Sequence, residues 1–271
     1  MLKSDKIADR LLNGVRTANS LYGLISAGDR IAVAVSGGKD SQTLIRLLAR
    51  WRAHDPIHYD LLGIHVSMEG VLPGYVENEQ ALFHLFQSLK VPLVIRPLGL
   101  APDEPLPITC YRCSWHRRKA VYMAAHQAGF TKIAVGHHAD DIIETALMNL
   151  LYHGRLESMP PRRELFGGAL TLVRPLALLE ERKLTYYARA AEFDGQSACC
   201  AWADLSKRTQ IRLLLHTMVK QAPRARVHIY RAVERAGNWR TDRLAVDEVE
   251  PARINPDATP GRRGNPQGSG R

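Results

Sequence analysis

The sequence of 271 residues predicts an α/β protein with a Rossmann-like parallel sheet flanked by helices. A β-branched apolar run at residues 31–35 is followed by small residues and then by a helical pattern at 41–48, which predicts a strand, a tight loop and a helix. Further apolar runs at 59–66 and 91–97 enclose a segment with apolar residues at helical spacing. Strands that alternate with helices in this way are typical of parallel sheets, since each parallel strand needs a long crossover connection.

The rest of the chain continues this alternation and then becomes helical. The expected elements are a helix at 113–128, a strand at 132–135, a helix from 142 to about 152, a strand at 170–176, and helices at 180–192 and 204–221. A basic segment with two prolines, 154–163, is predicted to be a loop. We expect four parts: an N-terminal helical segment at 1–25, the α/β domain at 26–180, a helical part at 181–240, and a disordered tail at 241–271.

Composition narrows the function classes. No stretch approaches the roughly 18 apolar residues of a membrane span, and residues 1–6 lack the apolar core of a signal peptide, so we expect a cytoplasmic protein without a membrane partner. The formal net charge is +10, of which the tail at 251–271, with four arginines and one aspartate, holds +3. The remaining excess fits a nucleic-acid partner, and it also fits a merely soluble protein.

Residues 36–41, Ser-Gly-Gly-Lys-Asp-Ser, form a short glycine-rich loop directly after the first strand. Gly37 and Gly38 let the backbone approach an oxyanion, and the N–H groups at the start of the next helix point at it. The loop is shorter than a Walker loop and resembles the pyrophosphate loop (PP-loop) of the N-type ATP pyrophosphatases. The alternative is a glycine-rich turn without a ligand, which would give Lys39 and Asp40 no structural purpose.

The four cysteines suggest a metal or redox site, because a cytoplasmic chain keeps its thiols reduced. Cys110 and Cys113 form a Cys-x-x-Cys pair, and Cys199 and Cys200 follow about ninety residues later. A closed four-ligand zinc site would need both members of the vicinal pair, which is awkward, whereas three cysteines leave an open corner on a cubane cluster. We favour an iron–sulfur site; zinc, a redox dithiol and inert cysteines remain open.

Several motifs occur together in a consistent order: residues 36–41, residues 110–113, the run from Gly136 to Ile142, Met159-Pro160-Pro161, Val173-Arg174-Pro175-Leu176 and a late cysteine. Over roughly residues 10–235 the sequence resembles the tRNA 2-thiocytidine biosynthesis protein (TtcA) family. The resemblance implies a PP-loop ATPase fold of the adenine nucleotide alpha hydrolase type. It also implies an ATP-dependent tRNA sulfurtransferase: ATP adenylates the C2 carbonyl oxygen of an anticodon-loop cytidine, and sulfur then displaces AMP to give 2-thiocytidine.

The same resemblance implies a 4Fe-4S cluster that carries the sulfur, with Cys110, Cys113 and Cys200 as its ligands. Cys200 is preferred because Arg208 lies eight residues later, where the corresponding helix of the family also carries an arginine. Family members commonly have Cys-x-x-Cys-Gly at this position. Here Cys199-Cys200 precedes Ala201, so Cys199 remains an alternative ligand.

We expect ATP to bind where the strands end, since ligands of open α/β sheets lie at the carboxyl ends of the strands. The expected contacts are Val35, Ser36, Gly37, Gly38, Lys39, Asp40, Ser41, His65, Val66, Gly136 and Asp141. His65 and Val66 are expected to contact adenine through the backbone or by stacking, and Gly136 to give room opposite them.

Three of these residues are the predicted catalytic residues. Lys39 would neutralise the pyrophosphate leaving group, and Asp40 and Asp141 would hold Mg²⁺. Asp140 and Asp141 could instead cap the following helix. We assign no proton-transfer role to His137 or His138.

The expected partners are tRNA and a sulfur donor protein such as a cysteine desulfurase, and a homodimer is a further expectation. Basic runs at 112–119 and 155–163, with Lys207, Arg208 and Arg212, could contact tRNA phosphates or form solvated helix faces. Two other functions stay open: an RNA-modifying ligase of the lysidine synthetase type, which needs no cysteines, and a zinc-stabilised nucleotide-binding module.

Overall fold

The computed structural model describes residues 2–68, 71, 79–100, 104, 108–193 and 207–240. Residues Met1–Thr241 form one compact unit, and the segment Asp242–Arg271 is separate from it and lies outside the described residues. Cys199, Cys200 and the tail predicted at 241–271 therefore also lie outside them.

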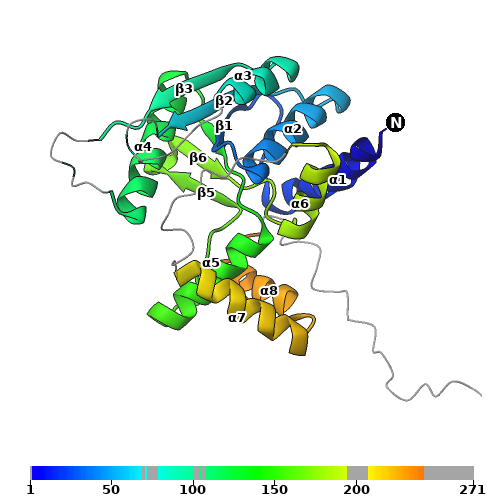
Figure 1. Cartoon of the computed structure of the whole chain (residues 1–271), viewed down its shortest axis with the longest axis vertical. Helices are drawn as coiled ribbons and strands as arrows, with labels where there is room; N and C mark the ends of the chain where they lie inside the picture. Colours follow the sequence, from blue (N-terminus) through cyan, green and yellow to red (C-terminus); the bar gives the residue numbers. More distant parts are fainter. Residues whose placement is uncertain are drawn as a thin grey trace, which may run out of the picture. The chain divides into compact units, whose positions relative to one another are not determined.

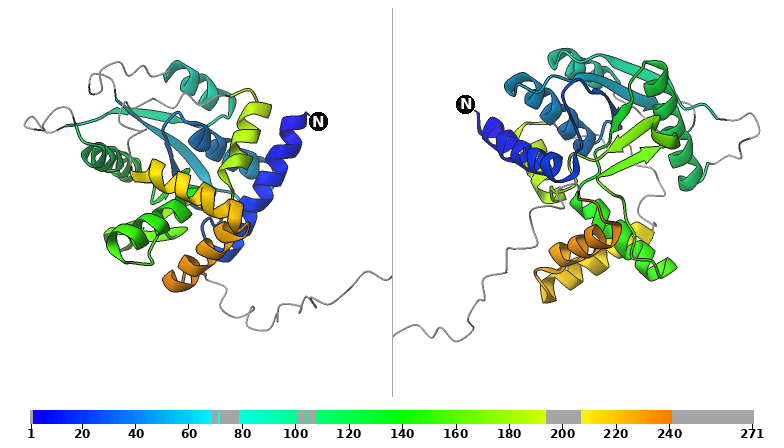
Figure 2. Two further views of the ribbon diagram at one scale, coloured as in Figure 1. Left: turned by 60° about the horizontal axis from the view of Figure 1, so that its bottom comes forward. Right: turned by 180° about the vertical axis from the view of Figure 1, so that it is seen from behind.

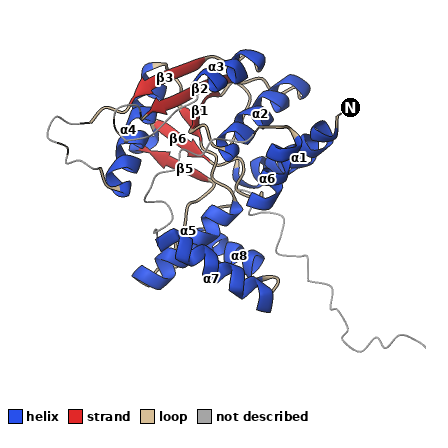
Figure 3. Ribbon diagram, viewed as in Figure 1, coloured by secondary structure: helices blue, strands red, loops and turns tan. Residues whose placement is uncertain are grey.

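A six-stranded sheet with the order β3-β2-β1-β4-β6-β5 forms the centre of the first unit (Figures 1 and 3). Its strands are β1 (Arg30–Val35), β2 (Asp60–Ser67), β3 (Leu93–Pro97), β4 (Lys132–Ala134), β5 (Arg162–Leu165) and β6 (Leu170–Val173). Five strands are parallel, which confirms the predicted α/β fold, and β5 pairs antiparallel with β6 at the edge. The prediction of a loop at 154–163 was wrong at its C-terminal end, because residues 162 and 163 belong to this edge strand.

The described helices are α1 (Lys3–Tyr22), α2 (Lys39–His54), α3 (Glu79–Ser88), α4 (Cys110–Gln127), α5 (Ala139–His153), α6 (Glu181–Ala190), α7 (Lys207–Gln221) and α8 (Ala225–Gly237), with a short 3₁₀ turn η1 (Phe166–Gly168). Two helices begin three residues before the predicted position. The Thr109 side chain caps α4 by accepting a hydrogen bond from the N–H of Arg112. His138 caps α5 in the same way, with Asp141 as its partner.

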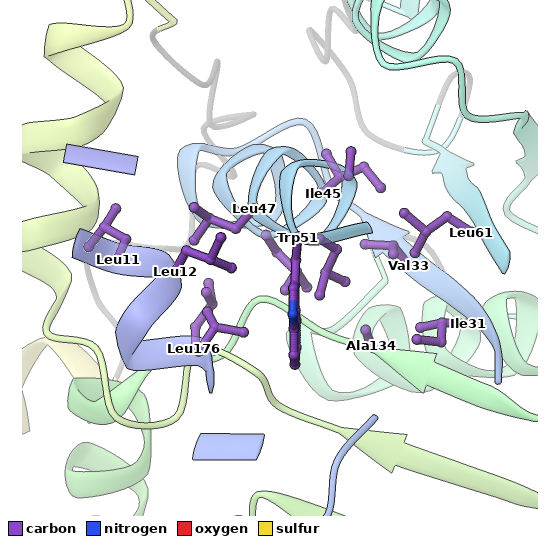
Figure 4. Close-up of a cluster of buried hydrophobic side chains, with 14 of the residues drawn as sticks. Leu11, Leu12, Ile31, Val33, Ile45, Leu47, Trp51, Leu61, Ala134 and Leu176 are labelled. Atoms are coloured by element: carbon purple, nitrogen blue, oxygen red, sulfur yellow. The ribbon is translucent and has the colours of Figure 1, made fainter. Parts of the chain in front are cut away.

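Alternation along the strands divides the core into two layers. Ile31, Val33 and Val35 of β1 pack on one face with α1, α2, α3 and α6, whereas Ala32 and the even-numbered residues of β2 pack on the other face with α4. Trp51 of α2 lies at the centre of the first layer, surrounded by aliphatic side chains from the sheet and from α1 (Figure 4). The α/β unit is thus closed on both faces, as a parallel sheet requires.

A third apolar cluster holds the C-terminal helices. Ile142, Ile143 and Leu147 of α5 pack against Ile211 and Leu215 of α7 and against residues of α8. Figure 2 shows α7 and α8 beside α5 in both views. Because α5 begins at the carboxyl edge of the sheet, this packing brings the C-terminal helices to the same edge. None of the described helices is long and apolar enough to cross a membrane.

Candidate functional site

The glycine-rich loop joins β1 to α2 and is held by its two serines. The Oγ of Ser41 accepts a hydrogen bond from the N–H of Ser36 at 3.2 Å and donates to the carbonyl oxygen of Gly38 at 2.9 Å. Gly37 has a φ of 82°, which side chains rarely tolerate. Gly38 is the N-cap of α2, so the first N–H groups of this helix face the loop without intrahelical partners. This is the geometry of an anion site.

Lys39 lies between two carboxylates. Its Nζ is 3.0 Å from Oδ2 of Asp40 and 3.0 Å from Oε1 of Glu181, at the start of α6. Burial acts to lower the pKa of Lys39, but the two carboxylates outweigh it and hold the pKa above its usual value. For Asp40 burial prevails and raises the pKa, despite the nearby Lys39 and His138. Lys39 is therefore a firmly protonated ammonium at the mouth of the loop.

The start of α5 faces the same point. The N–H of His138 donates to Oδ2 of Asp141 at 3.1 Å, and the N–H of Asp141 donates to Nδ1 of His138 at 3.4 Å. Since Nδ1 is an acceptor, a neutral His138 ring carries its proton on Nε2. That atom lies 3.4 Å from Asp141 and 3.9 Å from Asp40, so the two carboxylates predicted to hold Mg²⁺ converge on one ring.

Asp140 and Glu144, one turn apart on α5, connect the site to the C-terminal helices. Buried Asp140 accepts a hydrogen bond from the N–H of Glu181 at 2.7 Å and pairs with Arg226 of α8. Glu144, whose side chain is 2% exposed, pairs with Arg212 of α7 at 2.8 Å. Asp140 is thus an acceptor and an ion-pair partner inside the helix, whereas Asp141 makes the cap.

Gly136, on the loop between β4 and α5, has a packing requirement of its own. A Cβ at this position would lie 3.1 Å from the backbone carbon of Asp40 and 3.1 Å from the backbone nitrogen of Ser41. The glycine therefore lets the loop after β4 approach the first turn of α2 closely.

His65 and Val66 lie inside β2 rather than beyond its end, and His65 is opposite Val35 in the register. The His65 ring is buried, with Nδ1 2.7 Å from the carbonyl oxygen of Val35. This geometry does not favour stacking on adenine; a backbone contact stays a prediction.

Two further polar side chains, His137 after β4 and Arg174 after β6, have buried nitrogen atoms. Neither Nδ1 of His137 nor Nε of Arg174 has a hydrogen-bond partner among the described residues. Burial, and then the charge of Arg174, lower the pKa of His137 to about 4, so His137 is neutral at physiological pH. Arg174 is held by the carbonyl oxygen of Pro160.

Cys110 and Cys113 form the first turn of α4, with Cys110 exposed and Cys113 half-buried. A helix start favours thiolates, because its N–H groups carry partial positive charge, and the i, i+3 spacing puts both sulfurs on one side. The donor set therefore fits a thiolate-bound cluster. Glu104 lies beside the pair and binds Arg112 at 2.8 Å and His116 at 2.9 Å, and these bonds, chiefly that to Arg112, lower its pKa to about 2.

The structure brings the loop, Lys39, Asp40, Gly136 and Asp141 together, as predicted from the sequence. Glu181 was not predicted, nor were the roles of Asp140, Glu144 and Arg226. An acidic residue at the start of a predicted helix indicates only a favourable helix dipole, so no local signal separates Glu181 from an ordinary first-turn glutamate.

Comparison with known proteins agrees with this geometry. The PP-loop domain family matches residues 10–216. The tRNA-cytidine(32) 2-sulfurtransferase of Xylella fastidiosa (strain M12) is 35% identical over 247 residues, which cover 89% of this chain and 80% of that protein. The protein of the same name from Nitrosomonas eutropha is 37% identical over 196 residues, covering 70% of this chain and 61% of that protein.

Among solved structures, the U34-tRNA thiolase NcsA from Methanococcus maripaludis, with its [4Fe-4S] cluster, is similar in fold. Its TM-score is 0.70 at 21% identity, and the match covers 86% of this chain and 79% of that one. The chain therefore belongs to the PP-loop domain family and is an enzyme of the tRNA-cytidine 2-sulfurtransferase family.

Proposed function

We propose that this enzyme uses ATP to replace the C2 oxygen of an anticodon-loop cytidine in tRNA with sulfur, giving 2-thiocytidine. The observation that carries the proposal is that one chain combines a glycine-rich loop at the start of α2 with a Cys-x-x-Cys pair at the start of α4. The relatives named tRNA-cytidine(32) 2-sulfurtransferase support the same reaction.

The loop side supplies activation. The carbonyl oxygen of the base attacks the α-phosphorus of ATP, and pyrophosphate leaves. Lys39 and the first N–H groups of α2 would stabilise the charge on the leaving group. Asp40 and Asp141 would hold Mg²⁺, which would supply further positive charge for the phosphates. The activated C2 then accepts sulfur at the oxidation level of sulfide, and AMP leaves with the original oxygen.

The cysteine side supplies the sulfur. Cys110 and Cys113, with Cys200 from outside the described residues, would hold a 4Fe-4S cluster, which would supply a binding site for the sulfur that is transferred. A donor protein such as a cysteine desulfurase would deliver that sulfur as a persulfide, and a thiol or another two-electron reductant would release it at the oxidation level of sulfide. The cytoplasm is the compartment in which we place the reaction.

The decisive experiment is a nucleoside profile. The chain is expressed in a bacterial strain that lacks its own tRNA-cytidine 2-sulfurtransferase, and digested tRNA is analysed by mass spectrometry. We expect 2-thiocytidine to return with the wild-type chain and with Lys220→Ala, an exposed lysine on α7, but not with Lys39→Ala or Cys110→Ser. An unchanged profile with the wild-type chain contradicts the reaction.

Metal analysis separates the open alternatives. Anaerobically purified protein should contain about four irons and four sulfides per chain, and Cys200→Ser should lose them while Cys199→Ser keeps them. One equivalent of zinc without sulfide would favour the zinc-stabilised module. Modified RNA without any metal would favour a ligase.

A further inference from the structure

Helix α4 exposes aromatic rings along one side. The side chains of Tyr111 and Trp115 are 71% and 38% exposed and lie one turn apart. Tyr122 follows on the same side two turns later and makes an edge contact with Phe166 of η1, at 6.0 Å between ring centroids. Phe166 is itself 69% exposed. We call these four residues the α4 aromatic strip; Figures 1 and 2 show α4 beside β5 and β6, which flank η1.

Most of the strip is not used by the core. Helix α4 packs on the sheet through Val121, Ala124 and Ala125, and half-buried Tyr122 packs against the edge of the same cluster, whereas Tyr111, Trp115 and Phe166 stay exposed. Large aromatic rings that stay exposed after folding are common at binding surfaces, because their apolar area becomes buried when a partner binds.

Positive charge surrounds these rings. The guanidinium of Arg112 lies 5.2 Å from the Trp115 ring centroid, and the Nζ of Lys119 lies 5.3 Å from it. Helix α4 also contains Arg117 and Arg118 and has no Asp or Glu in its sequence. Cations interleaved with exposed rings match a polyanion whose flat rings are accessible, which describes single-stranded RNA. Paired RNA offers the same phosphates but hides its base faces.

We propose that the α4 aromatic strip is the platform on which unpaired bases of the tRNA loop stack beside the target nucleotide. The proposal rests on the proposed function, since it names the surface that holds that substrate. Its position supports it: Tyr111 and Trp115 lie on the first two turns of α4, the helix that begins with the predicted cluster ligands Cys110 and Cys113. Glu104 fixes Arg112 through two hydrogen bonds, which orients the guanidinium before RNA arrives.

The test measures binding of two labelled RNAs to the full-length holoprotein by fluorescence anisotropy. One is an anticodon stem-loop with cytidine in the loop, and the other is a fully paired duplex of equal length. Trp115→Ala should weaken stem-loop binding about 5- to 150-fold, the range expected for one stacked base, and should leave duplex binding unchanged. Trp115→Phe should restore most of the loss. Phe83→Ala is the matched control, because Phe83 is 57% exposed but lies on α3, in the opposite layer.

Lys119→Ala probes the charges separately. This variant should bind both RNAs more weakly. The slope of log affinity against log salt concentration should become shallower by about 0.7 to 0.9. Equal stem-loop affinities for wild type and Trp115→Ala overturn the proposal, and so does an equal loss for stem-loop and duplex. If stem-loop binding depends on Trp115 while no 2-thiocytidine is made in cells, the platform stands and the assigned chemistry fails.

Discussion

The ammonium of Lys39 lies 3.0 Å from the carboxylate of Glu181, although 142 residues separate them in the sequence. This ion pair joins the loop after β1 to the start of α6, so the cation that would meet the pyrophosphate is already oriented before ATP arrives. To reach the Lys39 ammonium, a bound triphosphate would have to displace the carboxylate of Glu181.

Removing this cation should therefore affect the chemistry more than the fold. For Lys39→Ala we expect kcat/KM for ATP cleavage to fall about 10²- to 10³-fold, as for other preorganised charges, with little change in the melting temperature. Pyrophosphate release in the presence of tRNA measures the rate. Lys220→Ala should behave as wild type, and a Lys39→Ala variant of normal activity would remove Lys39 from the mechanism.

Asp141 caps α5 and is proposed to hold Mg²⁺, and one substitution can separate these two roles. Asp141→Asn keeps an oxygen acceptor for the N–H of His138, so the free energy of unfolding should change by no more than about 0.5 kcal/mol. It removes a negative charge, so the Mg²⁺ concentration at half-maximal ATP cleavage should rise at least about tenfold. Denaturation and a magnesium titration of the same preparation check both. If Asp141→Asn lowered the free energy of unfolding by about 2 kcal/mol and left the Mg²⁺ dependence unchanged, Asp141 would act as a helix cap and not as a Mg²⁺ ligand.

Gly136→Ala should loosen the nucleotide loop. Its Cβ would fall 3.1 Å from the backbone of Asp40, so the first turn of α2 must shift, at a cost of about 1 to 3 kcal/mol. We expect weaker ATP binding by calorimetry together with a lower melting temperature. Gly99→Ala is the control, because nothing lies within 4 Å of a Cβ there. Equal ATP affinity in both variants would contradict the close approach.

The stability of the protein should fall as the pH is lowered from about 6.5 to about 4. In this window the unfolded His137 is protonated, whereas the folded one, with its pKa lowered to about 4 by burial and Arg174, is not. The unfolded state then binds more protons, so stability rises with pH, and His137 contributes up to about 3 kcal/mol to the difference. Urea denaturation at several pH values should show a flatter profile for His137→Gln. If stability changed with pH as steeply in His137→Gln as in the wild type, the pH dependence would arise from other groups.

The ion pair between Glu144 and Arg212 should hold α7 on α5. Among the described residues, Arg212→Met leaves the Glu144 carboxylate, which is 2% exposed, with only the more distant Arg208 at 3.8 Å, so we expect a loss of about 1 to 3 kcal/mol in the free energy of unfolding. The arginine is itself half-exposed, which keeps the loss below that of a fully buried pair. The double variant Glu144→Gln with Arg212→Met should recover part of it in a double-mutant cycle.

The strands of the parallel sheet could be predicted because each contains a short apolar run. Edge strand β5 could not, since Arg162, Arg163 and Glu164 are exposed and give no apolar signal. Helix starts were missed by three residues because the cap decides them; Thr109 is a usual cap, but His138 is an uncommon one. For the site, motifs close in sequence were found, while Glu181 and Arg226 depend on tertiary contacts that no local pattern encodes.

The bond between Asp140 and Arg226 has a consequence for how the enzyme is made. Every residue predicted to contact nucleotide lies before residue 142, yet among the described residues the arginine that pairs with the buried carboxylate of Asp140 comes from α8. Tyr22 of α1 likewise donates its hydroxyl hydrogen bond to Glu234 of α8 at 2.6 Å. During synthesis, the nascent chain therefore cannot complete the proposed nucleotide site until the start of α8 has emerged, and it cannot fasten α1 to α8 until Glu234 has followed. Premature termination before α8 should yield an unstable polypeptide rather than a working ATPase fragment.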